Sequence, residues 1–314
     1  MIQPLEFIYK KTSLGRLLQK LYSYLIERVL PDNWVVKHLY KKKTKQKLDL
    51  KNPKTLNEKI NWLKLYDRRE IHTLCADKYE VRNYISSTIG SEFLVDLYHQ
   101  DFSTDVINAN SLSQRPCIIK TNHDSGGGIF IYKDTKPNYD KIREQLKKRL
   151  EQNYYHAKKE WQYKNIKPRI IIEKLLLNQK GEIPMDYKVH CFNGKAEYIQ
   201  VDINRGTDNH ARNWYNKNWE KAKFKWTSNI NGYITNPTNK IIKRPMALEQ
   251  MLALSNKLAT PFPYVRIDWY DVDGKLYFGE ITFHHDGGGR LIEPSEWDYK
   301  LGAMVDLNRL SIIS

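Results

Sequence analysis

Two short patterns in the last fifth of the chain place charged side chains on consecutive strands. Arg266 and Asp268 are two residues apart in the apolar segment 264–272, and Glu280 and Thr282 are two apart in segment 275–282. Because side chains alternate between the faces of a strand, each pair shares one face. Facing carboxylates would attract Mg²⁺, and an arginine beside them would hold a phosphate. A surface salt bridge from Arg266 to either acid is the alternative.

The register of these two strands decides whether Asp268 and Glu280 can share an ion. A two-residue turn at Asp273-Gly274 would pair Asp268 with Gly279 and direct Glu280 to the other face. We therefore expect a three- or five-residue loop around Gly274, such as Asp273-Gly274-Lys275, or a bulge that adds one residue.

A second candidate site combines a lysine with a glycine-rich loop between two strands. Lys120 lies in the predicted strand 115–121, and Ser125-Gly126-Gly127-Gly128 precedes the predicted strand 129–132. Glycine allows backbone N–H groups to approach phosphate oxygens closely. The patterns GxxxxGK[ST] and GxGxxG are absent, so the loop is either a phosphate clamp or a simple turn. Glu173-Lys174, in the apolar segment 169–177, could offer backbone groups to an adenine edge or be a solvated strand end.

Three further residues follow the acidic strand. His284 and His285 lie between this strand and the glycines 287–289, and Arg290 comes next. They could bind a substrate carboxylate, and a histidine could accept a proton from an amine.

The charge of the chain favours an anionic partner. Among 314 residues, 52 are Lys or Arg and 36 are Asp or Glu, which gives a net charge of +16. Nucleic acid, an anionic membrane, nucleotide phosphates and an acidic polymer all fit, as does a merely lysine-rich surface. The three cysteines form no CxxC pair, which argues against a disulfide scaffold or a zinc site. The chain shows no secretory signal pattern and no apolar stretch of about 20 residues, so we expect a cytoplasmic protein.

The N-terminal region predicts an amphipathic helix over residues 14–30 that ends at Pro31, followed by lysines at 41–47. This combination could lie on an anionic membrane surface, or the helix could pack on the protein with its lysines in solvent.

The remaining elements are read from spacing and turn residues. A capping box at Thr55 and Glu58 predicts a helix start, and Asn193-Gly194 predicts a hairpin. Helices are expected over 76–88, 141–161 and 245–260, and 204–245 reads as an irregular insertion or substrate loop. Its aromatic residues could stack on sugar rings or pack in the core (Trp214, Tyr215, Trp219 and Trp226).

The order of these features over residues 75–290 resembles the ATP-grasp ligase superfamily. Within it, the chain is most similar to the TupA-like branch, which is linked to teichuronopeptide and other polysaccharide biosynthesis. The segments that carry the resemblance are TLNEKINWLKLYD, ADKYEVRNYI, IIKTNHDSGGG, DYKVHCFNG, VRIDWY and FGEITFHHDGGG.

The resemblance implies an α+β fold in which two α+β lobes with antiparallel sheets clasp ATP, preceded by a helical extension. The expected divisions are a basic extension at 1–52, a helical region at 53–112, a small lid lobe at 113–180 and a large lobe at 181–314.

The resemblance also implies roles for individual residues. Lys78 and Lys120 would contact phosphates, and residues 125–128 would close over them. Glu173 and the backbone of Lys174 and Leu175 would hold adenine. The other implied roles are ribose binding by Asp186, a phosphate contact from Lys188 or Arg205, stabilisation of the transferring phosphoryl group by Arg266, and Mg²⁺ binding by Asp268 and Glu280. Thr282 stands where the superfamily usually has Asn, which leaves the third ligand open.

These roles describe an ATP-dependent carboxylate–amine ligase that works through an acyl phosphate, with Lys120, Arg266 and Mg²⁺ neutralising charge. The branch suggests that a uronic acid of a bacterial surface polysaccharide precursor is joined to an amino acid. A glycosyltransferase, with Asp271-Val272-Asp273 as its metal motif, is the alternative reading. A nucleic-acid-binding protein would also explain the charge, but no recognition motif supports it.

Overall fold

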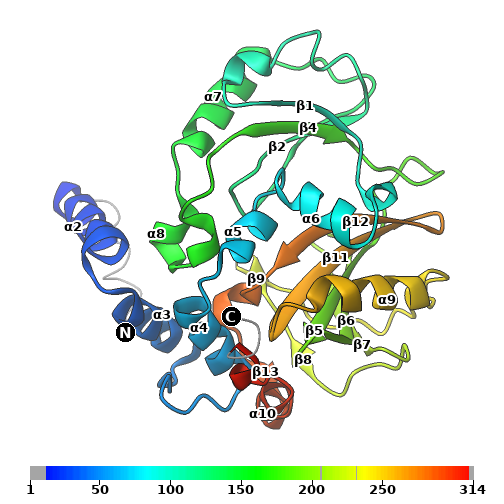
Figure 1. The fold of residues 1–314 in the computed structure, drawn as a ribbon. Coiled ribbons are helices and arrows are strands. Elements are labelled where there is room, and N and C mark those ends of the chain that lie inside the picture. Colours follow the sequence, from blue (N-terminus) through cyan, green and yellow to red (C-terminus); the bar gives the residue numbers. More distant parts are fainter. Residues whose placement is uncertain (1–11, 206, 231, 311–314) are drawn as a thin grey trace.

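The computed structural model describes residues 12–205, 207–230 and 232–310 as an α+β protein built around two antiparallel sheets (Figure 1). Each sheet carries helices and has its own hydrophobic core. Residues 1–11, the first part of the expected N-terminal extension, lie outside the described residues.

The small lobe is a four-stranded sheet in the order β1-β4-β2-β3. Helix α7 (Tyr139–Leu150) covers it, and Leu146 packs with Ile119 and Ile172. The sheet begins before residue 113, where the small lobe was expected to start, because β1 pairs with β4. The strands are β1 (Leu97–Asp101), β2 (Cys117–Thr121), β3 (Ile129–Ile131) and β4 (Ile170–Lys174).

The large lobe is a five-stranded sheet in the order β12-β11-β5-β6-β7. Helix α9 (Leu248–Ala259) packs on its apolar face, where Val189, Ile199 and Ile267 are fully buried. The Asn193-Gly194 hairpin is confirmed. The strands are β5 (Asp186–Phe192), β6 (Lys195–Ile203), β7 (Ala211–Asn216), β11 (Tyr264–Val272) and β12 (Lys275–Thr282).

The segment expected to be irregular, 204–245, contains more structure than its sequence indicates. Strand β7 completes the edge of the large sheet by pairing with β6. Trp214 and Trp226 stack at 5.4 Å and are buried, which confirms core packing for these two rings. The short strands are β8 (Lys225–Trp226), β9 (Asn229–Ile230), β10 (Tyr233–Ile234) and β13 (Ile292–Glu293).

Helices connect the lobes and support the large sheet. The capping box at the start of α4 is confirmed, because Thr55 and Glu58 each accept a hydrogen bond from the other's backbone N–H. The helix expected over 141–161 is interrupted after α7, where Asn153 caps a separate short helix. These helices are α4 (Leu56–Tyr66), α5 (Glu70–Ala76), α6 (Val81–Thr88), α8 (Tyr154–Lys158) and α10 (Glu296–Ala303). The 3-10 turns are η2 (Ser91–Phe93), η3 (Thr104–Val106), η4 (Trp161–Tyr163), η5 (His285–Gly288) and η6 (Leu307–Arg309).

The described part of the N-terminal extension is helical, as expected. Helix α2 (Ser13–Tyr24) continues into a π-helical turn, η1 (Leu25–Val29), and α3 (Asp32–Thr44) follows Pro31. The side chain of Thr12 caps α2 by accepting a hydrogen bond from Gly15 N. None of the helices that the structure describes is long and apolar enough to cross a membrane.

Candidate active site

The hairpin β11–β12 brings Asp268 and Glu280 together by a bulge. The turn is the regular two-residue Asp273-Gly274, since Val272 pairs with Lys275, so the expected longer loop is wrong. The register then shifts by one residue, because Gly279 and Glu280 both lie across from Asp268. The bulge that was predicted as the alternative to a longer loop is therefore confirmed, and it directs both carboxylates to one face of the sheet.

Arg266 joins these carboxylates. Its guanidinium donates to Asp268 from Nε at 2.6 Å and from Nη2 at 2.7 Å, and Nη2 also donates to Glu280 Oε1 at 2.7 Å. The arginine is buried, whereas 47% of the Glu280 side chain remains exposed. The ion pairs are therefore part of the fold, and Glu280 can still reach a ligand.

The charges around the hairpin keep Glu280 ionised. Partial desolvation by the surrounding side chains raises the pKa of Glu280, but the positive charges of Arg266, Lys78 and Lys188 lower it to about 2. The pKa of Asp268 is raised by burial, against the opposing effect of Arg266 and Lys188. Thr282 donates its hydroxyl hydrogen to Glu280 Oε1 at 3.1 Å, so it orients the carboxylate in this structure.

Charged residues extend across the polar face of the large sheet. Lys188 on β5 contacts Asp186 and lies 3.2 Å from Asp268 Oδ2. Arg205 reaches the same Asp186 carboxylate at 2.8 Å, but its side chain is 63% exposed. Lys188 is thus held inside an acidic cluster, and Arg205 is the freer of the two expected phosphate contacts.

Sequence reasoning missed the continuation of this polar face onto β6 and β7. Asp202 accepts a hydrogen bond from Arg212 Nε at 2.8 Å, and both are buried. The missed signal was polar residues at every second position of an otherwise apolar strand, as in Gln200 and Asp202 on β6.

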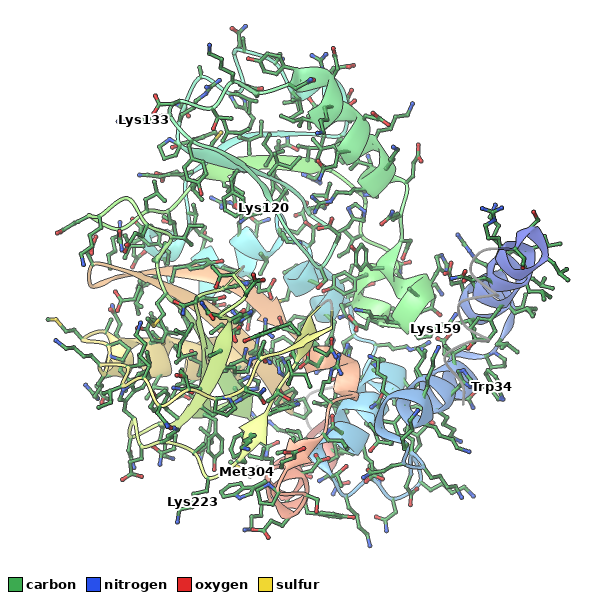
Figure 2. All side chains as sticks on the ribbon, turned by 180° about the vertical axis from the view of Figure 1, so that it is seen from behind. Trp34, Lys120, Lys133, Lys159, Lys223 and Met304 are labelled. Atoms are coloured by element: carbon green, nitrogen blue, oxygen red, sulfur yellow. The ribbon has the colours of Figure 1, made fainter. Side chains whose placement is uncertain are left out.

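The small lobe contributes its own cluster. Lys120 Nζ lies 2.8 Å from Glu173 Oε2, so the expected phosphate and adenine residues meet in an ion pair. Figure 2 shows Lys120 where the small lobe approaches the large one. Lys78 donates to the carbonyl of Asp124 and lies 3.5 Å from its carboxylate. Burial lowers the pKa of Lys78, while the negative charges of Asp124 and Glu280 raise it. The pKa of this lysine therefore depends on residues of both lobes.

The glycine-rich loop is attached to helix α7 by an arginine that sequence reasoning did not identify. Arg149 donates to Asp124 Oδ2 at 2.7 Å from Nε and to the carbonyls of Gly127 at 2.8 Å and Gly126 at 3.2 Å. Ser125, Gly126 and Gly127 are exposed, whereas Asp124 is buried. The loop tip is therefore open to solvent, and Arg149 holds both its carbonyls and the buried Asp124 at its base.

The backbone N–H groups expected to hold adenine are already engaged. Lys174 N donates to Asp96 O at 2.9 Å, and Leu175 N donates to Pro116 O at 3.1 Å. The Lys174 side chain lies 3.2 Å from Asp96. These two amides are used to hold the lobe together, so the structure does not present them to a ligand.

The two histidines after β12 are both buried, and His285 lies beside Arg266. Arg266 Nη1 donates to Nδ1 of His285 at 2.9 Å, so this nitrogen is an acceptor. Burial lowers the pKa of both His284 and His285 well below the ordinary value. His285 is therefore a weak base whose Nδ1 is occupied, which argues against its role as proton acceptor. Arg290 donates to Asn229 O at 3.2 Å.

The alternative metal motif lies at the tip of the β11–β12 hairpin. Asp271 accepts a hydrogen bond from Gly274 N at 2.8 Å, and Asp273 accepts one from Gln179 N at 2.9 Å. Asp271 thus stabilises the turn and Asp273 joins it to the loop at Gln179, away from the Arg266 cluster on the strands.

The residues present fit Mg²⁺ together with a nucleotide. Within the described parts of the chain, no three His, Cys, Asp or Glu side chains form a cluster able to hold a metal ion alone. Mg²⁺ is commonly bound through one or two carboxylates, with phosphates and water completing its shell. Asp268 and Glu280 provide such a pair, and a phosphate-bearing ligand would provide the rest.

Comparison with known proteins agrees with this architecture. A family model described as TupA-like ATPgrasp matches residues 58–306. The chain belongs to this TupA-like family of the ATP-grasp ligase superfamily, and its fold is the expected ATP-grasp fold. No curated protein matches it.

The solved structures that the chain matches have low sequence identity and TM-scores of 0.40 or less. D-alanine–D-alanine ligase from Bacillus anthracis, complexed with ATP, is 16% identical, with a TM-score of 0.39 over 67% of this chain and 55% of that chain. N5-carboxyaminoimidazole synthase from Aspergillus clavatus is 10% identical, with a TM-score of 0.37 over 69% and 46%. The ATP-grasp ligase PsnB is 9% identical, with a TM-score of 0.40 over 79% and 67%. The chain spans about half the length of the first two.

Proposed function

We propose that this protein is an ATP-dependent carboxylate–amine ligase. The observation that supports this most directly is the Arg266 guanidinium held between Asp268 and Glu280. This cluster faces cationic groups from Lys78 and Lys188. Such a site suits a triphosphate with a divalent ion, because both signs of charge are already fixed in place.

The reaction has two steps. A carboxylate oxygen of the first substrate attacks the γ-phosphorus of ATP, and the bond to the ADP oxygen breaks. The nitrogen of an amine then attacks the acyl carbon, phosphate leaves, and the nitrogen loses a proton to form the amide. Lys120 and Arg266 would orient the phosphates and neutralise their charge. Mg²⁺, held by Asp268 and Glu280, would supply further charge neutralisation when bound.

The proposed substrates are a uronic acid of a bacterial surface polysaccharide precursor and an amino acid. The family and the net charge of +16 support an acidic saccharide. Sugar stacking by Trp214 and Trp226 is not part of the proposal, because both rings are buried. We place the reaction in the cytoplasm, in keeping with three free cysteines.

The test is ADP release with purified protein, ATP and Mg²⁺, across pairs of uronic acids and amino acids. We expect ADP only when both are present, with an amide product detected by mass. Glu280→Gln should remove ADP formation and the thermal shift that Mg²⁺ with ATP produces. The matched control is Glu197→Gln, a partly buried glutamate on β6 paired with Lys217. Sugar transfer from a nucleotide sugar without ATP would instead identify a glycosyltransferase.

A further inference from the structure

The N-terminal helix carries an apolar stripe that remains open to solvent. Six aliphatic side chains recur at helical spacing along α2 and η1, and each is at least 38% exposed. Leu14 is 66% exposed, Leu17 is 62% exposed and Val29 is 56% exposed. In both views α2 stands away from the two lobes at one side of the molecule (Figures 1 and 2). The stripe consists of Leu14, Leu17, Leu18, Leu21, Leu25 and Val29.

The base of this helix is attached to the protein, so the direction of the stripe is defined. Ile26 is buried, and the Lys159 ammonium donates to the carbonyl of Glu27 at 3.0 Å. Arg28 contacts His156 on α8 at 2.9 Å, and the Tyr155 hydroxyl donates to Asp32 at 2.7 Å. The stripe therefore projects from a fixed base.

Aromatic side chains continue the apolar surface from α2 onto α3. The Tyr22 hydroxyl lies 2.7 Å from Nε2 of His38, and the His38 ring stacks on Trp34 at 5.2 Å. Tyr22 and Trp34 are 44% and 47% exposed. We call these two rings and the aliphatic stripe the N-terminal patch.

Positive charge borders this patch. Lys37, Lys41 and Lys42 are exposed and follow Trp34 at spacings of three, seven and eight, which places them on the same side of α3. The opposite side of α3 is buried through Val35, Val36 and Tyr40. Residues 12–47 contain nine Lys or Arg and two acidic residues, so the patch lies in a strongly cationic surface.

We infer that the N-terminal patch docks onto the surface of an anionic lipid bilayer. The exposed leucines supply an apolar face, and Tyr22 and Trp34 suit the headgroup level, where amphipathic rings are favoured. The neighbouring lysines match anionic headgroups, because the negative surface potential of such a membrane attracts basic side chains. The 12 residues of α2 are too few to span a bilayer, so the helix lies along the surface.

The experiment measures binding of the full chain to phosphatidylcholine vesicles, with and without phosphatidylglycerol. We expect binding to the anionic vesicles only, weakening as salt shortens the screening length from about 10 Å at 0.1 M to about 3 Å at 1 M. The triple variant Leu14→Ser, Leu17→Ser, Leu21→Ser should bind the anionic vesicles at least about tenfold more weakly than the unaltered protein. The triple variant Lys37→Gln, Lys41→Gln, Lys42→Gln should weaken binding by a similar factor.

Matched controls separate the patch from general surface properties. The triple variant Ile183→Ser, Ile241→Ser, Met246→Ser removes three apolar side chains elsewhere, each at least 52% exposed. Lys221→Gln, Lys223→Gln, Lys225→Gln removes the same charge far from Trp34, as the positions of Trp34 and Lys223 in Figure 2 show. Both controls should bind like the unaltered protein.

Two further readouts decide the outcome. Brominated lipid should quench part of the tryptophan emission in the unaltered protein, and Trp34→Phe should remove that quenched part. Failure of the unaltered protein to bind anionic vesicles, or equal binding by the leucine variant, would overturn the inference. So would a dimer in solution that the leucine variant converts to a monomer, because the patch would then bind a second copy.

Discussion

Glu280 faces the same side of the large sheet as Asp268 because a bulge at Gly279 adds one residue to β12 opposite Asp268. The alternation of buried residues along β12 shifts by one position at this bulge. Leu276 and Phe278 are buried before the glycine, and Ile281 is buried after it. The bulge thus keeps an apolar core on one face while both carboxylates occupy the other.

Substitution of Gly279 should destabilise this hairpin. A Cβ at this position would lie 3.0 Å from the carbonyl oxygen of Asp268 and 3.2 Å from the Tyr270 ring. Gly279→Val should therefore lower the free energy of unfolding by about 1–3 kcal/mol, the usual cost of overpacking. Urea denaturation measures this change in unfolding free energy. Gly127→Val is the control, because a Cβ at Gly127 meets nothing within 4 Å. Equal stability of the two variants would show that the bulge tolerates a side chain.

Arg266 and Lys120 should differ in their effects on stability. Arg266→Met removes the guanidinium that joins the carboxylates of Asp268 and Glu280, so we expect a loss of about 3–5 kcal/mol in unfolding free energy. Lys120→Met breaks a more exposed pair with Glu173, for which about 1 kcal/mol or less is expected. Both variants should lose ATP binding in a calorimetric titration. An Arg266→Met protein as stable as the unaltered one would contradict the structural part of this role.

Arg149 should determine how firmly the glycine-rich loop is held. Arg149→Gln removes charge-assisted hydrogen bonds to Asp124 and the loop carbonyls, each worth about 1.5–3 kcal/mol. We expect amide hydrogen exchange in residues 125–128 to rise at least about tenfold, and KM for ATP to increase. Arg143→Gln on the same helix is the control, since Arg143 pairs with the exposed Asp140. Unchanged exchange would mean that Arg149 does not hold the loop.

Local patterns in the sequence predicted much of the fold. Asn193-Gly194, the capping box of Thr55 and Glu58, and the alternation in β11 all depend on neighbouring residues. Strand β7 was missed because its pairing with β6 across the loop, not its own pattern, stabilises it. The same limit applies to the site: Arg266 and Asp268 were identified together, whereas Arg149 meets Asp124 only through tertiary packing.

Asp67 should make stability depend on pH in the acid range. Its carboxylate is buried and accepts hydrogen bonds from Arg69 at 2.7 and 2.9 Å. The Nε2 atom of His72 lies 3.3 Å from Asp67 Oδ2. Burial raises the pKa of Asp67, but His72 and Arg69 lower it to about 2. The unfolded value is about 3.9, so the ionised group stabilises the protein above that pH and loses this contribution as pH falls toward 2.

The test compares Asp67→Asn with the unaltered protein in urea denaturation from pH 5 to pH 2. The difference in unfolding free energy between the unaltered protein and Asp67→Asn should shrink by about 2 kcal/mol from pH 5 to pH 2, since each pKa unit corresponds to about 1.4 kcal/mol. Asp140→Asn, at a side chain that is 93% exposed, should run parallel to the unaltered protein. Parallel curves for Asp67→Asn as well would show that Asp67 titrates normally, and its contacts with Arg69 and His72 would then contribute no pH dependence.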